Sequence, residues 1–79
     1  MKNILVRVYS PTGTPAQNAR VCLWIYQFLA SGSKEGTTNS SGEIEFDLDI
    51  DNGAEISINV DGVEYIRRCN IQGVYRIQL

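Results

Sequence analysis

Apolar and polar residues alternate with a period of two along most of this chain. Successive side chains of a β-strand point to opposite faces, so such a pattern predicts strands with one buried and one solvated face. No segment shows a convincing helical period of 3.6. The clearest alternation covers residues 43–50, where acidic residues separate Ile44, Phe46, Leu48 and Ile50.

Turn residues divide the chain into seven expected strands. Asp61-Gly62, between two apolar runs, is the dipeptide that a two-residue type I′ hairpin favours, and Gly42 suits a position of positive φ. Turns at intervals of about 8 to 12 residues are typical of a β-sandwich or small barrel. We expect residues 1–79 to form one all-β domain, a seven-stranded antiparallel Greek-key β-sandwich. Its strands are expected at residues 3–9, 19–30, 34–38, 43–50, 55–60, 63–69 and 74–79.

The inward positions of the clearest alternations define the expected core. The residues that share this property are Val21, Leu23, Ile44, Phe46, Leu48, Ile56, Ile58 and Val60.

The second expected strand is unusual because both of its faces are apolar. A helix is possible there on length, but β-branched and aromatic residues favour the extended state. Each sheet of a sandwich has one inward face, so the second apolar row needs a cover. Three kinds of cover are considered for this row. The first is intramolecular, by residues 10–18 or by the aliphatic stems of Arg20 and Arg76. The second is an interface with another protein or a second copy of the chain, and the third is a carbohydrate stacked on the aromatic rings. The candidate interaction residues are Cys22, Trp24, Tyr26 and Phe28, with Tyr9 echoing the pattern on the first strand.

Size and composition argue against an enzyme. The chain has 79 residues and no histidine, so it lacks a Ser-His-Asp or Cys-His relay and has little interior for a deep pocket. A net charge of −2 and only seven scattered basic residues argue against nucleic acid as a partner. No signal-peptide core or membrane-spanning run is present. Localisation is therefore open, and would be extracellular or at the cell surface if the chain is part of a larger exported protein.

Five carboxylates follow one another at alternate positions, from Glu43 to Asp51. Such a row could bind calcium or a basic partner, but an EF-hand that begins at Asp47 requires Gly at the sixth and a carboxylate at the twelfth position. Asn52 and Ile58 stand there instead. We therefore expect no metal and no cofactor, and a solvated face paired across strands with some of Arg20, Arg67, Arg68 or Arg76.

The two cysteines, Cys22 and Cys69, leave two alternatives open. They could close a long loop through a disulfide, or remain separate, partly buried thiols. The sequence contains no CxxC motif that would indicate a metal or redox site, and two cysteines are too few for the disulfide framework of a small secreted scaffold.

The order of turns resembles that of a known family. Residues 10–23, with Gly13, Pro15 and Ala19, resemble the "D-x-x-G-x-P-x-x-G-A-x-V-x-L" opening of carboxypeptidase regulatory-like domains, and residues 38–46 resemble their "T-(D/N)-x-x-G-x-x-x-F" segment. Ser10 and Asn18 depart from the pattern, where an acidic residue and Gly are preferred. The resemblance implies a transthyretin-like (prealbumin-like) sandwich and a non-catalytic structural, stabilising or adhesive unit.

These observations favour a non-enzymatic structural or protein-interaction module that self-associates, as a possible homodimer, or docks on another protein through the aromatic outer face of its second strand. The alternative is a glycan-binding or cell-surface accessory domain of a larger secreted protein.

Overall fold

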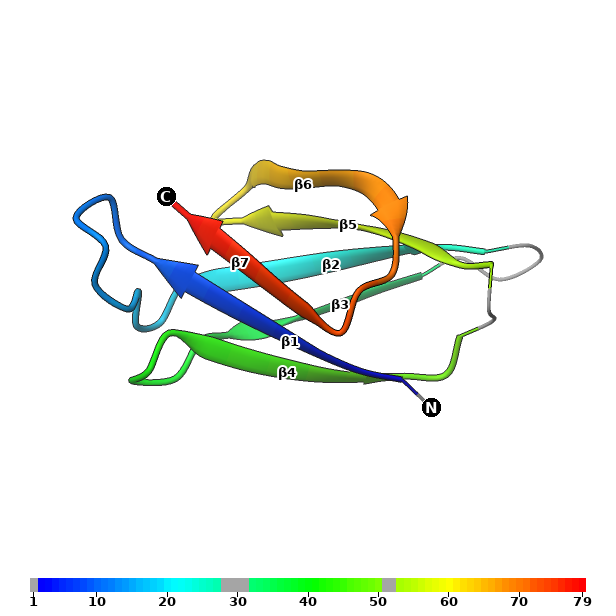
Figure 1. The fold of residues 1–79 in the computed structure, drawn as a ribbon, viewed down its shortest axis with the longest axis horizontal. Helices are drawn as coiled ribbons and strands as arrows, with labels where there is room; N and C mark the ends of the chain where they lie inside the picture. Colours follow the sequence, from blue (N-terminus) through cyan, green and yellow to red (C-terminus); the bar gives the residue numbers. More distant parts are fainter. Residues whose placement is uncertain (1, 28–31, 51–52) are drawn as a thin grey trace.

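A computed structural model describes residues 2–27, 32–50 and 53–79. They form seven β-strands and no helix, so the all-β expectation is confirmed (Figure 1). No helix that could cross a membrane is found among these residues. The strands are β1 (Lys2–Tyr9), β2 (Arg20–Tyr26), β3 (Gly32–Thr37), β4 (Glu43–Leu48), β5 (Glu55–Val60), β6 (Val63–Asn70) and β7 (Val74–Gln78).

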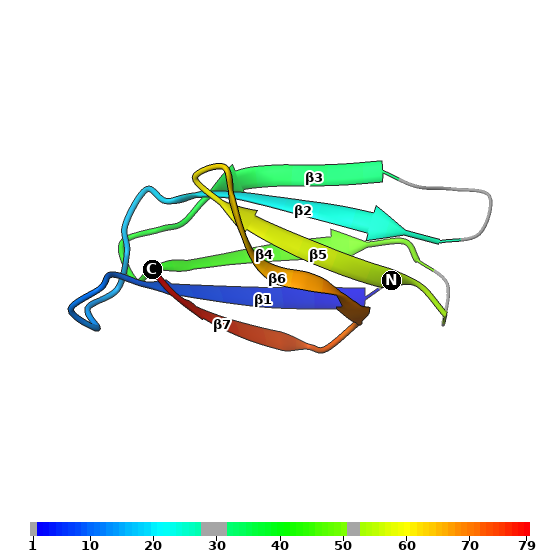
Figure 2. The same cartoon turned by 90° about the horizontal axis from the view of Figure 1, so that it is seen from above.

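The strands build two sheets that pack face to face (Figure 2). The three-stranded sheet has the order β4-β1-β7, and the four-stranded sheet has the order β3-β2-β5-β6. Four of the pairs are antiparallel, but β7 lies parallel to β1. The expectation of a fully antiparallel sandwich is therefore wrong at this pair. The two strands stand at opposite ends of the sequence, so the intervening strands provide the long connection that a parallel pair requires.

Three turns have the backbone that their residues favour. Asp61 and Gly62 have φ values of 51° and 85°, and two positive values in succession define the expected type I′ hairpin. Gly42 has a φ of 73°, also as expected. Asn18 adopts a φ of 60°, which asparagine tolerates better than most residues, so it takes the conformation for which glycine is preferred.

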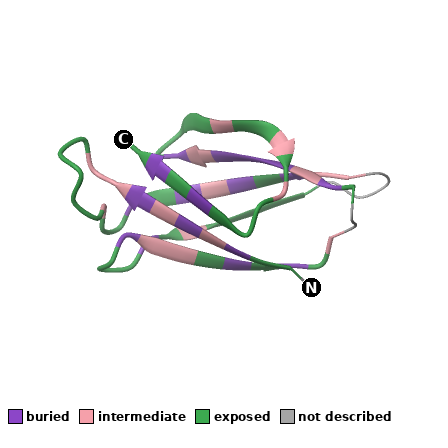
Figure 3. Cartoon of the chain, in the orientation of Figure 1, coloured by how far each residue is buried: buried purple, intermediate pink, exposed green. Residues whose placement is uncertain are grey.

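The core fills the space between the sheets (Figure 3). Seven of the eight expected core residues are buried. Ile44 is the exception and lies half-buried at the rim, where its Cδ1 atom occupies the space beside Gly36 that a Cβ would fill. Side chains that the expected core did not include complete it: Ile4, Val6, Val8, Ala19, Ile25, Tyr75 and Ile77.

A buried threonine joins two loops at one end of the sandwich. The Thr38 hydroxyl accepts a hydrogen bond from Ala19 N at 2.9 Å and donates one to the Ala16 carbonyl. The Thr38 backbone adds bonds to Asn18 N and Ala19 O. The loop before β2 is therefore fixed to the turn after β3.

Thr38→Val should lower the free energy of unfolding by about 1–3 kcal/mol, because it removes the hydroxyl that bonds the buried Ala19 N–H and the half-buried Ala16 carbonyl, at nearly unchanged side-chain volume. Thermal melting should show a fall of several degrees. Thr37→Val, at the exposed neighbouring position, is the control and should change stability by less than about 0.5 kcal/mol. Equal melting of both variants would contradict the role of the Thr38 hydroxyl.

Candidate functional site

The outer face of the four-stranded sheet holds most of the candidate interaction residues. Trp24 lies on β2 between Ser33 of β3 and Ser57 of β5. Cys22 lies between Glu35 and Asn59 in the same way. Paired residues of adjacent strands point to the same face, so polar side chains flank the apolar row on both sides.

Trp24 is the exposed centre of this face. It is 45% exposed and borders an open hollow of about 540 Å³. The other residues that line the hollow are Arg20, Cys22, Glu35, Asn59, Asp61 and Gly62. An indole surrounded by a guanidinium, an amide and two carboxylates can stack on a flat group and hydrogen-bond its substituents.

Hydrogen bonds hold the charged rim of the hollow. Arg20 Nη2 lies 3.0 Å from Glu35 Oε1, and both side chains are largely exposed, so this pair adds little to stability. The Arg20 backbone N–H donates to Asp61 Oδ1 at 3.1 Å, and Asp61 N donates to Arg20 O at 2.8 Å. The Asp61-Gly62 hairpin therefore sets the position of one carboxylate at the rim of the hollow.

Tyr26, in contrast, is covered from within the chain. The Arg68 guanidinium carbon lies 4.6 Å from the centre of the Tyr26 ring, and Arg68 Nε contacts Glu55 Oε1 at 3.0 Å. The Tyr26 hydroxyl also lies 3.2 Å from Ser57 Oγ. An intramolecular arginine cover is thus present, but it comes from β6 and not from Arg20 or Arg76.

The expected row of interaction residues does not form one continuous patch. Tyr9 belongs to the three-stranded sheet, where the Arg76 guanidinium carbon lies 5.4 Å from its ring centre. Phe28 lies outside the described residues. Cys22 is half-buried, so Trp24 is the most accessible of the four candidate residues that the structure describes.

The cysteines are separate thiols. Cys22 is on the outer face of the four-stranded sheet, whereas Cys69 is paired with the fully buried Ile56 and therefore points inward. The Cys69 sulfur lies 3.9 Å from the Tyr75 hydroxyl. The four-stranded sheet therefore lies between the two sulfur atoms. Of the two alternatives that the sequence left open, the structure has separate thiols and no disulfide.

The acidic row of β4 pairs across strands, but not with the expected arginines. Arg7 Nε contacts Glu43 Oε2 at 2.9 Å, and Asn3 Nδ2 donates to Glu45 Oε2 and Asp47 Oδ1 at 3.3 and 3.0 Å. The expected partners are wrong because β4 pairs with β1, which carries Arg7 and Asn3. Which strand lies beside β4 depends on the tertiary structure and could not be read from the local sequence pattern.

We expect no divalent-metal requirement. Within the described residues, no three side chains of the metal-ligating types come together. Thermal melting with EDTA and with millimolar calcium should give the same midpoint, because a ligand stabilises only a protein that binds it. A calcium-dependent rise of many degrees would contradict the solvated role of Asp47 and Asp49.

No protein-family model matches the chain, and a search of curated proteins found no match to it.

Proposed function

We propose that this chain is a non-enzymatic interaction module that self-associates through the outer face of its four-stranded sheet. The observation that carries the proposal is the half-exposed Trp24 beside its hollow. Tryptophan is the residue most enriched among those that dominate binding energy at protein interfaces. Covering the indole would remove apolar surface from water at about 25 cal/mol per Å².

A second copy fits the charges of this face. The rim carries the Arg20 guanidinium and the carboxylates of Glu35 and Asp61 within one hollow. A two-fold axis places the same patch on both subunits, so a positive group of one copy can meet a negative group of the other. The indoles then lie near the axis, where they are shielded from water by the charged rim.

Trp24→Lys should give a folded monomer, because two ammonium groups would face each other across the interface. Sedimentation velocity across a concentration series should show dimers for the parent and monomers for this variant. The matched control is Val74→Lys, which replaces an equally exposed apolar residue on the other sheet and should leave the dimer intact. A parent that stays monomeric at millimolar concentration would contradict self-association.

One observation favours a second candidate, glycan binding by an accessory domain of a larger exported protein. Polar residues lie beside Trp24 on both neighbouring strands, Ser33 on β3 and Ser57 on β5, and Asn59 and Asp61 line the same hollow. Sugar rings stack on indoles while their hydroxyls bond such groups. The chain contains a single tryptophan, so intrinsic fluorescence reports on this site alone. A glycan array followed by fluorescence titration of the hits should show saturable quenching if this candidate is correct.

We also propose that the sandwich is of the transthyretin-like, Greek-key kind found in carboxypeptidase regulatory-like domains. Support comes from the positive φ of Asn18 and Gly42, two turn positions of the resembling motifs. An experimental structure with a different strand order would contradict this proposal.

A further inference from the structure

The two sheets are unequal, and the three-stranded sheet ends at β7. Among the described residues, β7 pairs with β1 and with no other strand. Leu5 N donates to Gly73 O at 2.9 Å, and Leu79 N donates to Tyr9 O at 2.8 Å. In a parallel ladder alternate residues face the same neighbour, so the N–H and C=O groups of Val74, Arg76 and Gln78 point away from β1.

This edge lacks the protection that both edges of the other sheet have. β3 carries Lys34 on its inner side, opposite the buried Leu23, and β6 is interrupted by two register shifts. An inward-pointing lysine and β-bulges both hinder the pairing of a further strand. By contrast, β7 pairs in regular register along its length, and its inward residues Tyr75 and Ile77 are buried.

Exposed apolar residues flank the same edge. The described chain has four exposed large apolar residues, and three of them, Val63, Tyr65 and Val74, lie on β6 and β7. Val63 is paired with the buried Val60, so it belongs to the inner side of β6 although it is 54% exposed. Figure 1 shows β6 extending beyond β7, where the three-stranded sheet has no further strand to cover it.

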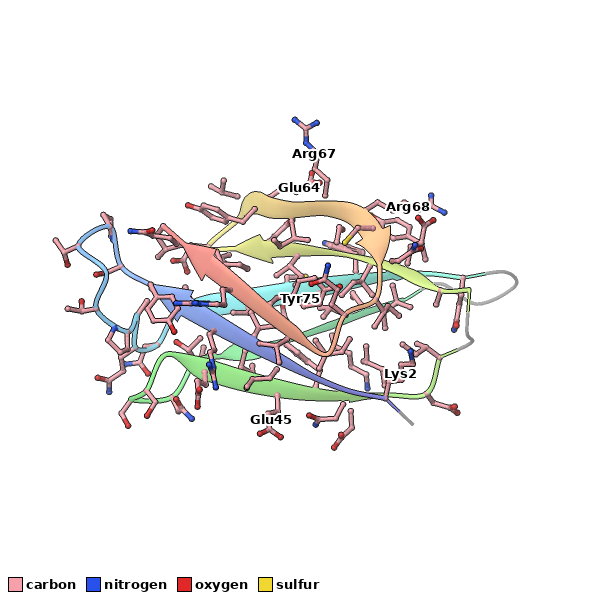
Figure 4. The ribbon with its side chains drawn as sticks, in the orientation of Figure 1. Lys2, Glu45, Glu64, Arg67, Arg68 and Tyr75 are labelled. Atoms are coloured by element: carbon pink, nitrogen blue, oxygen red, sulfur yellow. The ribbon has the colours of Figure 1, made fainter. Side chains whose placement is uncertain are left out.

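The positive charges along this side are not paired with carboxylates, although the Arg76 guanidinium carbon lies 5.4 Å from the centre of the Tyr9 ring. Arg76 of β7 and Arg67 of β6 form no ion pair with any described residue, and Arg67 points away from the body of the protein (Figure 4). The carboxylates of the three-stranded sheet stand on β4, at its opposite edge. Carboxylates on a strand added beside β7 would therefore meet Arg76, whose guanidinium has no carboxylate partner among the described residues.

We propose that an extended segment of a partner protein adds to β7 as a fourth strand of this sheet. Its backbone bonds the outward groups of Val74, Arg76 and Gln78. Its apolar residues, at alternate positions, face inward and cover Val63, while carboxylates between them face outward beside Arg76. Strand addition of this kind takes affinity from main-chain hydrogen bonds and specificity from alternate side chains.

A second copy of this chain fits the edge less well than such a segment. Antiparallel pairing of β7 with β7 would bring two Arg76 side chains to the same small region, and β3 would bring Lys34. β4 has the required acidic and apolar alternation, but Phe46 and Leu48 are already buried in its own core. A partner segment has inward side chains free to cover β6.

The test uses a synthetic peptide with the alternation Glu-Ile-Glu-Phe-Asp-Leu and the full chain labelled with ¹⁵N. Titration should give saturable shifts, with slowed amide exchange at Val74, Arg76 and Gln78 and shifts at Val63. A peptide with lysines in place of the carboxylates should bind at least about tenfold more weakly. Absence of saturable shifts, or shifts confined to the Trp24 hollow, would overturn the proposal.

Two variants distinguish the contribution of the Arg76 backbone N–H to peptide binding from that of its side-chain charge. Arg76→Pro removes an N–H that points away from β1 and keeps the pairing with β1, since proline is tolerated on edge strands, and it should abolish binding. Arg76→Ala keeps the N–H and should only weaken binding several-fold. Val63→Lys, which places a charge under the added strand, tests the inner contacts if the proline variant fails to fold. Unchanged binding in the folded variants would overturn the proposal.

The parent without peptide provides the remaining outcome. If amide exchange of β7 slows as the protein concentration rises, a second copy of the chain occupies the edge, and the proposal of a partner segment is wrong. Because the Trp24 hollow is on the other sheet, Trp24→Lys should leave peptide binding unchanged. Loss of self-association and loss of peptide binding are thereby distinguishable.

Discussion

Phe46→Ala should lower the free energy of unfolding by about 3–5 kcal/mol. Phe46 is 6% exposed and is paired with the fully buried Ile4 of β1, so the truncation leaves a cavity between the sheets. A domain of this length has a total stability of only about 4–12 kcal/mol. The variant should therefore be partly unfolded near its working temperature, as urea titration followed by circular dichroism would show.

Tyr65→Ala is the matched control for Phe46→Ala. It removes an aromatic ring of similar size from an exposed position on β6 and should cost less than about 1 kcal/mol, because no sealed cavity forms. If Phe46→Ala melts within a few degrees of the parent, the inward position of Phe46 is wrong.

Gly42→Ala should be the second most damaging change, at about 2–4 kcal/mol. The residue has a φ of 73°, and left-handed backbone costs a residue with a Cβ about 1–2 kcal/mol. Its Cβ would stand 2.6 Å from the Val8 carbonyl oxygen and 3.0 Å from Ala16 N. Both are backbone atoms, and the Ala16 N–H donates a hydrogen bond to the Val8 carbonyl at 2.9 Å. Neither atom can therefore move away without stretching this hydrogen bond. This steric conflict adds about 1–2 kcal/mol.

Gly62→Ala isolates the conformational part of that cost. Gly62 has a φ of 85°, but no atom lies within 4 Å of its Cβ position. We therefore expect a loss of only about 1–2 kcal/mol in chemical denaturation. Equal losses for the two variants would show that the close approach at Gly42 contributes nothing.

Trp24 and β7 offer two surfaces of different chemistry on different sheets. The first is an exposed indole beside a hollow with a charged rim, and the second is a backbone edge beside apolar residues. A module with both could assemble through one and hold a partner through the other. Each surface has a variant that disturbs it without touching the core, so the two roles can be tested independently.

Local pattern alone determined the strands and several turns. The alternation over residues 43–50 predicts both β4 and the buried positions of Phe46 and Leu48, because a side-chain period of two is a property of the strand itself. Asp61-Gly62 predicts its hairpin because the turn depends on the φ preferences of two adjacent residues. Both features need no knowledge of distant parts of the chain.

Only the tertiary structure decided which strands are neighbours. Arg7 beside Glu43, Arg68 over Tyr26, and the separation of Tyr9 from Trp24 all depend on pairings between segments far apart in the sequence. The parallel position of β7, which creates the unprotected edge, is of the same kind. Alternation determines which face of a strand is buried, but it carries no information about the strand alongside, because any apolar row can pack against another.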